Sequence, residues 1–87
     1  MSKHHVLKIH GCYFDAVRDG RKTFEIRKDD REFKEGDTGT LNELGGPLSP
    51  SLYTGRSINF AITYVTSFFQ REGWVVFGIK PLHTESK

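Results

Sequence analysis

Only one stretch of the 87-residue chain has the apolar spacing of an amphipathic helix. Tyr13, Phe14 and Val17 recur at helical intervals, and Gly20 follows where a left-handed residue commonly ends a helix. We therefore predict one short helix, roughly from Tyr13 to Asp19, that packs through these three apolar side chains. Because parallel strands need a long crossover connection, usually a helix, a single helix cannot support a parallel sheet. The sheet is expected to be largely antiparallel, or closed into a small barrel.

Most of the remaining chain alternates apolar and polar residues as strands do. Strands are predicted at residues 5–10, 22–27, 38–44, 57–66 and 74–79, with one Gly- and Pro-rich loop at residues 45–51. Leu7 and Ile9 are expected to point into the core, and so are Phe24 and Ile26, which share one face of the second strand. Ile58, Phe60, Ile62 and Tyr64 are predicted to face one way, while Phe68, Phe69 and Trp74 are predicted to fill the core or close one end of a barrel. The predicted fold is mainly β (α+β), a small β-barrel with one main α-helix between the first two strands.

Length and composition are those of a small folded domain. Eighty-seven residues leave room for one hydrophobic core, so we predict a single domain over residues 1–87, with loose ends outside a core at about 5–80. A formal charge of +2 neither requires nor excludes nucleic acid as a partner. No apolar run approaches the roughly 20 residues that span a membrane, and no signal peptide opens the chain. A cytoplasmic protein without a membrane partner is expected.

No metal or cofactor site is expected from the residue types. A single cysteine, Cys12, excludes a disulfide framework and a Cys-based zinc site. His4 and His10 are predicted to lie on the same face of the first strand, but too far apart to bind one ion. The sequence contains no Gly-rich phosphate loop of the Walker or dinucleotide-binding type.

Residues 20–27, GRKTFEIR, fit the pattern G-x-K-x-x-E-x-R where the predicted helix leads into the second strand. Glu25 and Arg27 are two residues apart on a strand, so their side chains share a face, and Lys22 can reach that face from the junction. A lysine and an arginine around a carboxylate can bind a phosphate, while the carboxylate accepts hydrogen bonds from the amino edge of a base. The alternative interpretation is a surface ion pair, which stabilises a protein by only about 0–1 kcal/mol.

Residues 53–56, YTGR, follow the predicted loop. The tyrosine ring can stack on a base, the glycine lets the backbone approach a ligand, and the arginine fork can bind a phosphate. The alternative is an ordinary turn in which Tyr53 covers one end of the barrel. Lys28 and Lys34, by contrast, are expected on a solvated, charged turn without a role in binding.

In this context the GRKTFEIR string resembles the signature of ASCH domains, which are relatives of the PUA-like barrels. The chain looks like a small stand-alone ASCH subfamily over about residues 5–80. The similarity to this subfamily extends to residues 5–9, 13–14, 30–33, 36–37, 41–43 and 53–56. The resemblance implies a PUA-like β-barrel with a cleft beside the first helix and a role in recognising RNA or a modified nucleoside. At the family's first-strand position, His5 is expected to be a hydrogen-bonded structural residue.

The first functional hypothesis is a binding module that recognises a nucleotide in this cleft. Lys22, Glu25, Arg27 and Arg56 are expected to converge on it and to contact one nucleotide-sized anion. The full set of predicted RNA- or nucleotide-binding residues is Lys22, Thr23, Glu25, Arg27, Arg31, Tyr53, Thr54 and Arg56.

The second hypothesis is an enzyme, because some small ASCH relatives deacylate an N-acylated cytidine nucleoside and ribonuclease activity has been attributed to others. By that resemblance Lys22 and Glu25 would be the catalytic residues. The deacylating relatives, however, carry a threonine at the position of Glu25, and a carboxylate cannot replace a hydroxyl nucleophile unchanged. We therefore favour binding, with a protein-interaction module as a third hypothesis. The expected partner is RNA or a modified nucleoside or nucleotide, bound by a monomer without a cofactor.

Overall fold

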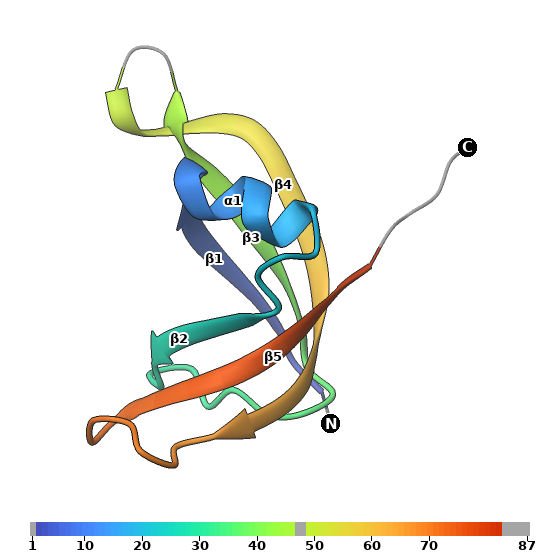
Figure 1. Ribbon diagram of the computed structural model, residues 1–87, viewed down its shortest axis with the longest axis vertical. Coiled ribbons are helices and arrows are strands. Elements are labelled where there is room, and N and C mark those ends of the chain that lie inside the picture. The colour runs from blue at the N-terminus through green and yellow to red at the C-terminus, as the bar shows by residue number, and fades with distance from the viewer. Residues whose placement is uncertain (1, 47–48, 83–87) are drawn as a thin grey trace.

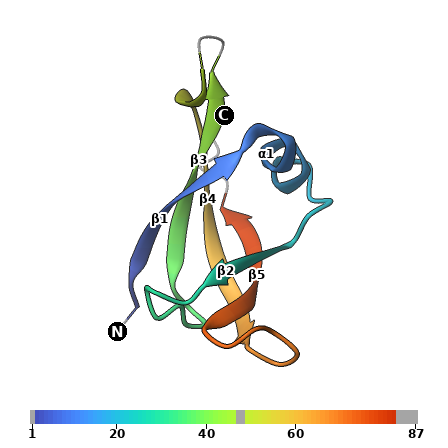
Figure 2. The same cartoon turned by 90° about the vertical axis from the view of Figure 1, so that its left-hand side faces the viewer.

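The computed structural model describes residues 2–46 and 49–82 of the chain. Its elements are β1 (His4–His10), α1 (Gly11–Arg18), β2 (Phe24–Lys28), β3 (Thr38–Gly46), β4 (Ser49–Thr66) and β5 (Trp74–Leu82). The strands form one curled sheet in the order β1-β3-β4-β5-β2, a half-barrel with α1 against its concave side (Figure 1, Figure 2). The predicted mainly β fold, with one helix between the first two strands, is confirmed.

Three of the four strand pairs are antiparallel, as predicted, and the pair β1–β3 is parallel. The connection between β1 and β3 contains both α1 and β2, so one helix and one strand together supply the crossover. β1 and β2 are the two ends of the sheet, and within residues 2–46 and 49–82 they do not pair with each other. This leaves a gap between β1 and β2.

α1 packs on the sheet through two of its three predicted contacts. Phe14 and Val17 are buried, whereas Tyr13 is 50% exposed, so the predicted burial of Tyr13 is wrong. The helix starts earlier than predicted, at Gly11, and Tyr13 lies on the side of the gap between β1 and β2. In the part of the chain that the structure describes, no helix is long and apolar enough to cross a membrane.

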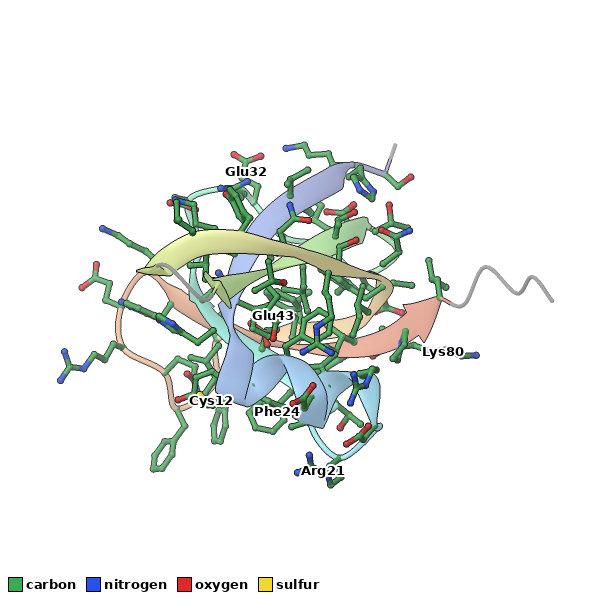
Figure 3. All side chains as sticks on the ribbon, turned by 90° about the horizontal axis from the view of Figure 1, so that it is seen from above. Cys12, Arg21, Phe24, Glu32, Glu43 and Lys80 are labelled. Atoms are coloured by element: carbon green, nitrogen blue, oxygen red, sulfur yellow. The ribbon has the colours of Figure 1, made fainter. Side chains whose placement is uncertain are left out.

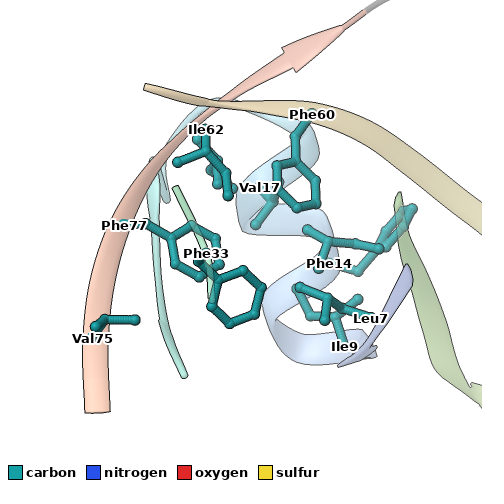
Figure 4. Close-up of a cluster of buried hydrophobic side chains, with 11 residues drawn as sticks. Leu7, Ile9, Phe14, Val17, Phe33, Phe60, Ile62, Val75 and Phe77 are labelled. Carbon is teal, nitrogen blue, oxygen red and sulfur yellow. The ribbon is translucent and has the colours of Figure 1, made fainter. Parts of the chain in front are cut away.

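The hydrophobic core fills the space between the curled sheet and α1 (Figure 4). The rings of Phe33 and Phe77 have centroids 4.6 Å apart, and those of Phe60 and Phe77 are 6.3 Å apart. Each buried side chain of this size contributes about 1.5–3 kcal/mol of transfer free energy. The buried apolar residues are Leu7, Ile9, Phe14, Val17, Phe33, Leu41, Phe60, Ile62, Val75, Phe77 and Ile79, which confirms the inward face predicted for the first strand.

A buried polar pair lies beside this core. His5 Nε2 is 2.8 Å from Asp37 Oδ2, and both side chains are buried. Burial raises the pKa of Asp37, but hydrogen bonds from His5 and from the backbone amides of Lys3 and Lys34 outweigh it and hold the pKa below the ordinary value. His5 is therefore a hydrogen-bonded structural residue, as predicted.

The predicted orientation of β2 is wrong. Phe24 and Ile26 are 43% and 50% exposed, whereas Glu25 is only 4% exposed. The register explains the reversal, because Glu25 lies opposite the buried Phe77 of β5, and residues opposite each other on neighbouring strands share a face. The alternation of apolar and polar residues along β2 is the same whichever face of the strand points inward. Only the pairing with β5 therefore decides which face is buried.

Several aromatic residues that we expected in the core are exposed. Phe68 and Phe69 are 79% and 94% exposed in the turn between β4 and β5, and Trp74 is 38% exposed at the start of β5. Tyr64 is 63% exposed because a register shift between Ile62 and Tyr64 changes the alternation of β4, so that Val65 and not Tyr64 packs against the core. The prediction that Phe68, Phe69 and Trp74 fill the core is wrong, and so is the prediction that Tyr64 shares a face with Phe60 and Ile62.

The connection between β3 and β4 is shorter than the predicted loop at residues 45–51. β3 continues to Gly46 and β4 begins at Ser49, while residues 47–48 lie outside the described part of the chain. Residues 53–56 consequently belong to β4 and do not form a turn. The positive φ of Gly55, +95°, and the register shift in β3 between Asn42 and Leu44 make this part of the hairpin irregular.

Candidate functional site

A hollow of about 690 Å³, here called the first hollow, opens at the gap between the end strands β1 and β2. Residues 8–10 of β1 and 24–28 of β2 form its two walls, and Tyr13 and Lys22 close it on the side of α1. Leu44 and Trp74 complete the lining. The first hollow therefore lies beside the helix.

The end of α1 sets the position of Lys22. Gly20 has a φ of +82°, a left-handed conformation that glycine adopts without steric cost. The chain reverses there, and the backbone amides of Arg21 and Lys22 both donate to the carbonyl oxygen of Ala16. Lys22 is thus fixed two residues before the start of β2, and its side chain reaches along that strand to Glu25.

The buried carboxylate of Glu25 binds two cations. Lys22 Nζ donates to Glu25 Oε2 at 2.5 Å and to the carbonyl oxygen of Phe24 at 2.7 Å. Arg27 donates to Glu25 Oε1 from Nε at 3.0 Å, and its Nη2 is 2.9 Å from the same oxygen. The predicted cluster of Lys22, Glu25 and Arg27 is therefore formed, as a buried acid between two partly exposed bases. Charge-assisted bonds of this kind fix the orientation of all three side chains.

Aromatic rings surround the ammonium group of Lys22. Its Nζ lies 4.9 Å from the ring centroid of Phe24 and 5.5 Å from that of Tyr13, distances at which a cation is attracted to a ring face. Both rings line the first hollow, and each is about half exposed. The reversed orientation of β2 therefore supplies the hollow with apolar surface as well as charge.

Two arginines bridge the gap between the strands. Arg27 Nη2 donates to the carbonyl oxygen of Lys8 at 2.7 Å, and Arg31 Nη1 donates to that of Val6 at 3.0 Å. Both acceptors belong to β1, on the edge that does not pair with β3. The guanidinium groups thus take the place of a neighbouring strand and bind the otherwise unpaired carbonyl edge.

A second hollow, of about 350 Å³, adjoins the first. Arg31, Tyr53 and Phe33 line the second hollow alone, whereas Lys8, Arg27 and Lys28 line both. Lys28 is the last residue of β2 and lines both hollows, so it does not lie on the predicted turn. The first hollow is lined by Lys8, Lys22, Arg27 and Lys28 against one carboxylate, Glu25, so its potential is positive.

Arg56 and Thr54 belong to a different cluster, centred on Glu43 of β3. Arg56 binds both carboxylate oxygens of Glu43, at 2.7 and 2.8 Å, and Thr54 Oγ1 donates to one of them at 2.7 Å. These hydrogen bonds lower the pKa of Glu43 to about 2, against the effect of burial. Figure 3 shows Glu43 near the middle of the molecule beside the helix, where Arg56 also contacts Asp15 and covers the ring of Phe14.

The structure thus divides the predicted site residues into separate groups. Lys22, Glu25 and Arg27 meet in the first hollow, and Arg31 and Tyr53 lie in the second. Arg56 and Thr54 line neither of these two hollows, so Arg56 does not join the predicted convergence. Thr23 has an exposed side chain and contributes its carbonyl oxygen to the amide of Ile79.

Sequence reasoning missed Lys8, His10, Tyr13 and Trp74, all of which line the first hollow. The period-two pattern of the first strand did place Lys8 and His10 opposite the core, and that face proves to border the gap. Within residues 2–46 and 49–82, no three His, Cys, Asp or Glu side chains come close enough together to hold a metal ion.

The fold and the site define a small, mainly β half-barrel domain with a cation-lined hollow between its end strands. The chain belongs to the family described as domain of unknown function DUF3850, whose family model matches residues 4–79. It is also similar to the "Uncharacterized 12.9 kDa protein in GpA 3'region" of Escherichia phage P2, with 42% identity over 66 residues. That similarity covers 76% of this chain and 57% of the phage protein, so the chain spans little more than half the length of this relative.

Proposed function

We propose that this domain binds RNA or a nucleotide, with one nucleotide in the first hollow. The proposal rests on one observation: the buried carboxylate of Glu25 is held between Lys22 and Arg27 on the wall of a hollow lined by aromatic rings. A fixed carboxylate can accept hydrogen bonds from the amino group of a base, and the cations beside it can bind a phosphate.

The rest of the lining suits the same ligand. Tyr13, Phe24 and Trp74 are each between 38% and 50% exposed and offer ring faces to a base, whose stacking contributes about 1–3 kcal/mol. Lys8 and Lys28 add positive charge at the strand edges. A few cations around one hollow support modest affinity for a nucleotide, and this affinity should decrease as the salt concentration rises. They do not support tight binding to a long duplex.

The resemblance of residues 20–27 to the ASCH signature supports the same class of ligand, as does its implied PUA-like barrel with a cleft beside the first helix. In this chain the hollow lies next to α1, and the residues of the signature form one of its walls. An RNA- or nucleoside-binding ASCH domain is thus the specific form of the proposal.

Binding is favoured over hydrolysis by the contacts of Lys22. A general base must lie free within hydrogen-bond reach of the proton that it removes. Here Lys22 Nζ is already engaged, because it donates to the Glu25 carboxylate and to the carbonyl oxygen of Phe24. If the protein were a deacylase or a ribonuclease that uses Lys22, the ion pair between Lys22 and Glu25 would have to break before catalysis.

The test is a titration of the labelled protein with the four nucleosides, the four 5′-mononucleotides and short RNAs, followed by NMR. We expect the largest shifts for residues that line the first hollow. Arg27→Ala should weaken mononucleotide binding and reduce the slope of log K against log salt by about one. Glu25→Gln should alter base preference more than affinity. Arg71, in the exposed turn between β4 and β5, provides the matched control Arg71→Ala.

Thermal unfolding of each variant separates lost binding from lost folding. If Arg27→Ala and Arg71→Ala change affinity equally in folded protein, the first hollow is not the binding site. If no nucleoside, nucleotide or RNA shifts any resonance of the first hollow at millimolar concentration, the proposed function is wrong.

A further inference from the structure

The second hollow continues the first along the gap in the half-barrel. Lys8, Arg27 and Lys28 line both, so the two hollows share one wall. The proposed function accounts for the first hollow and assigns nothing to the second. The ligand that fits the second hollow can be inferred from its charge, its ring and the positions of its arginines.

The charge of the second hollow favours an anion. Four cationic side chains, Lys8, Arg27, Lys28 and Arg31, line it against the single carboxylate of Asp30. The Arg31–Asp30 contact is long, 3.9 Å, and both side chains are about half exposed or more, so it neutralises little of this charge.

The two guanidinium groups are anchored at neighbouring points on the edge of β1. Arg27 is anchored on the carbonyl oxygen of Lys8 and Arg31 on that of Val6. Carbonyl groups two residues apart on a strand are about 6.6 Å apart, at about 3.3 Å per residue. Guanidinium groups anchored at this spacing can both donate N–H···O bonds of about 2.8 Å to one tetrahedral anion between them.

Both arginines keep donors for such an anion. Among the contacts of the described residues, Arg27 uses Nε and Nη2, and Arg31 uses Nη1 for its hydrogen bond. Since a guanidinium group carries five N–H donors, each arginine can bind β1 and a ligand together. The anchoring bonds to β1 also reduce the entropy lost when the ligand binds.

A ring completes the second hollow. Tyr53 of β4 lines it and is 57% exposed, which leaves a face of the ring open to a stacked base. The two hollows therefore share Lys8, Arg27 and Lys28, with Glu25 and three aromatic rings in the first and Arg31 and Tyr53 in the second.

We propose that the two hollows bind two consecutive nucleotides of one single strand, with the phosphodiester that links them held by Arg27 and Arg31. One nucleotide occupies the first hollow, and the base of the next stacks on Tyr53. This inference rests on the proposed function, which it makes more specific: the ligand is a single-stranded phosphodiester of at least two nucleotides.

The test compares five probes by calorimetry or NMR: a nucleoside, its 5′-mononucleotide, the matching dinucleoside monophosphate, the same dinucleoside with an uncharged methylphosphonate link, and inorganic phosphate. The dinucleoside monophosphate should bind at least about tenfold more tightly than the nucleoside, because it adds one stacked base and one charged contact. The methylphosphonate should lose most of this gain. Inorganic phosphate alone should bind most weakly.

Variants test whether the additional affinity for the dinucleoside monophosphate comes from the second hollow. Arg31→Ala and Tyr53→Ala should each weaken dinucleoside binding at least about fivefold more than nucleoside binding. Arg31→Gln keeps a donor for the Val6 carbonyl but removes the charge, so it should behave as Arg31→Ala while preserving the fold. Arg71→Ala and Tyr64→Ala, at exposed positions outside both hollows, should leave both affinities unchanged.

The outcomes separate this inference from the proposed function. If nucleosides bind in the first hollow but the dinucleoside binds no more tightly, the inference is wrong and the proposed function stands. If the methylphosphonate binds as well as the phosphodiester, or inorganic phosphate binds as tightly as the dinucleoside, the phosphodiester assignment is wrong. If no probe perturbs either hollow, both proposals fail.

Discussion

Replacing Glu43 by glutamine is expected to change how the stability of the domain depends on pH. Arg56 and Thr54 lower the pKa of Glu43 in the folded state to about 2, from an ordinary value of 4.5. Because the folded-state pKa is the lower one, the Glu43 carboxylate stabilises the fold above about pH 4.5. This contribution decreases as the pH falls and is lost near pH 2.

The structure also limits the size of this effect. At about 1.4 kcal/mol per pH unit, the full difference in pKa would correspond to about 3 kcal/mol. The side chain of Arg56, the main cause, is 46% exposed, so solvent screens part of the interaction. We therefore expect the Glu43 carboxylate to contribute about 1–2 kcal/mol at neutral pH.

The assay is chemical denaturation of the wild type and of Glu43→Gln at a series of pH values from 7 to 2. The difference between their free energies of unfolding should be largest at pH 7 and should shrink between about pH 5 and pH 2. Taking this difference cancels the contribution of Asp37, whose pKa is also lowered. Glu35→Gln, on an exposed turn, is the matched control for the change of one carboxylate to an amide. A Glu43→Gln difference that is equally large at pH 7 and at pH 2.5 would refute this reasoning.

Four further predictions concern the core, the exposed rings and catalysis. Gly39→Ala should lower the free energy of unfolding by at least about 1–3 kcal/mol, because its Cβ would lie 2.3 Å from a buried phenylalanine ring and 2.8 Å from a backbone oxygen; an unchanged denaturation midpoint would contradict it. Changing Phe68 and Phe69 together to serine should alter stability by less than about 0.5 kcal/mol per site. Phe77→Ala, in the core, should cost about 3–5 kcal/mol. Incubation with N-acylated cytidine, followed by chromatography, should show no turnover; turnover that Lys22→Ala abolishes while binding persists would establish the enzyme instead.

The sequence by itself determined the order of the helix and strands. It also determined the cluster of three site residues that lie near one another in the chain. Periodicity is a local property, so one helical spacing and five alternating segments were enough to predict one helix and five strands. Lys22, Glu25 and Arg27 lie within six residues, and strand geometry after the turn at Gly20 brings them together whatever the rest of the chain does.

Only the tertiary structure decided which faces are buried and which distant residues meet. Alternation along β2 allows either Glu25 or Phe24 and Ile26 to face the core, and the pairing of β2 with β5 selects Glu25. The alternation of apolar residues alone predicted that Phe24 and Ile26 are buried. It cannot show that Lys22 and Arg27 neutralise the Glu25 carboxylate, which makes the burial of Glu25 tolerable.

Long-range pairing likewise decided the partners of the arginines. Arg56 binds Glu43 because β3 and β4 are neighbours, and Arg27 and Arg31 bind β1 because β1 and β2 are the two ends of a sheet that curls toward closure. Strand order and curvature depend on contacts between residues far apart in the chain, and these leave no periodic signal in the sequence. The gap between β1 and β2, and with it both hollows, is therefore a product of the tertiary structure alone.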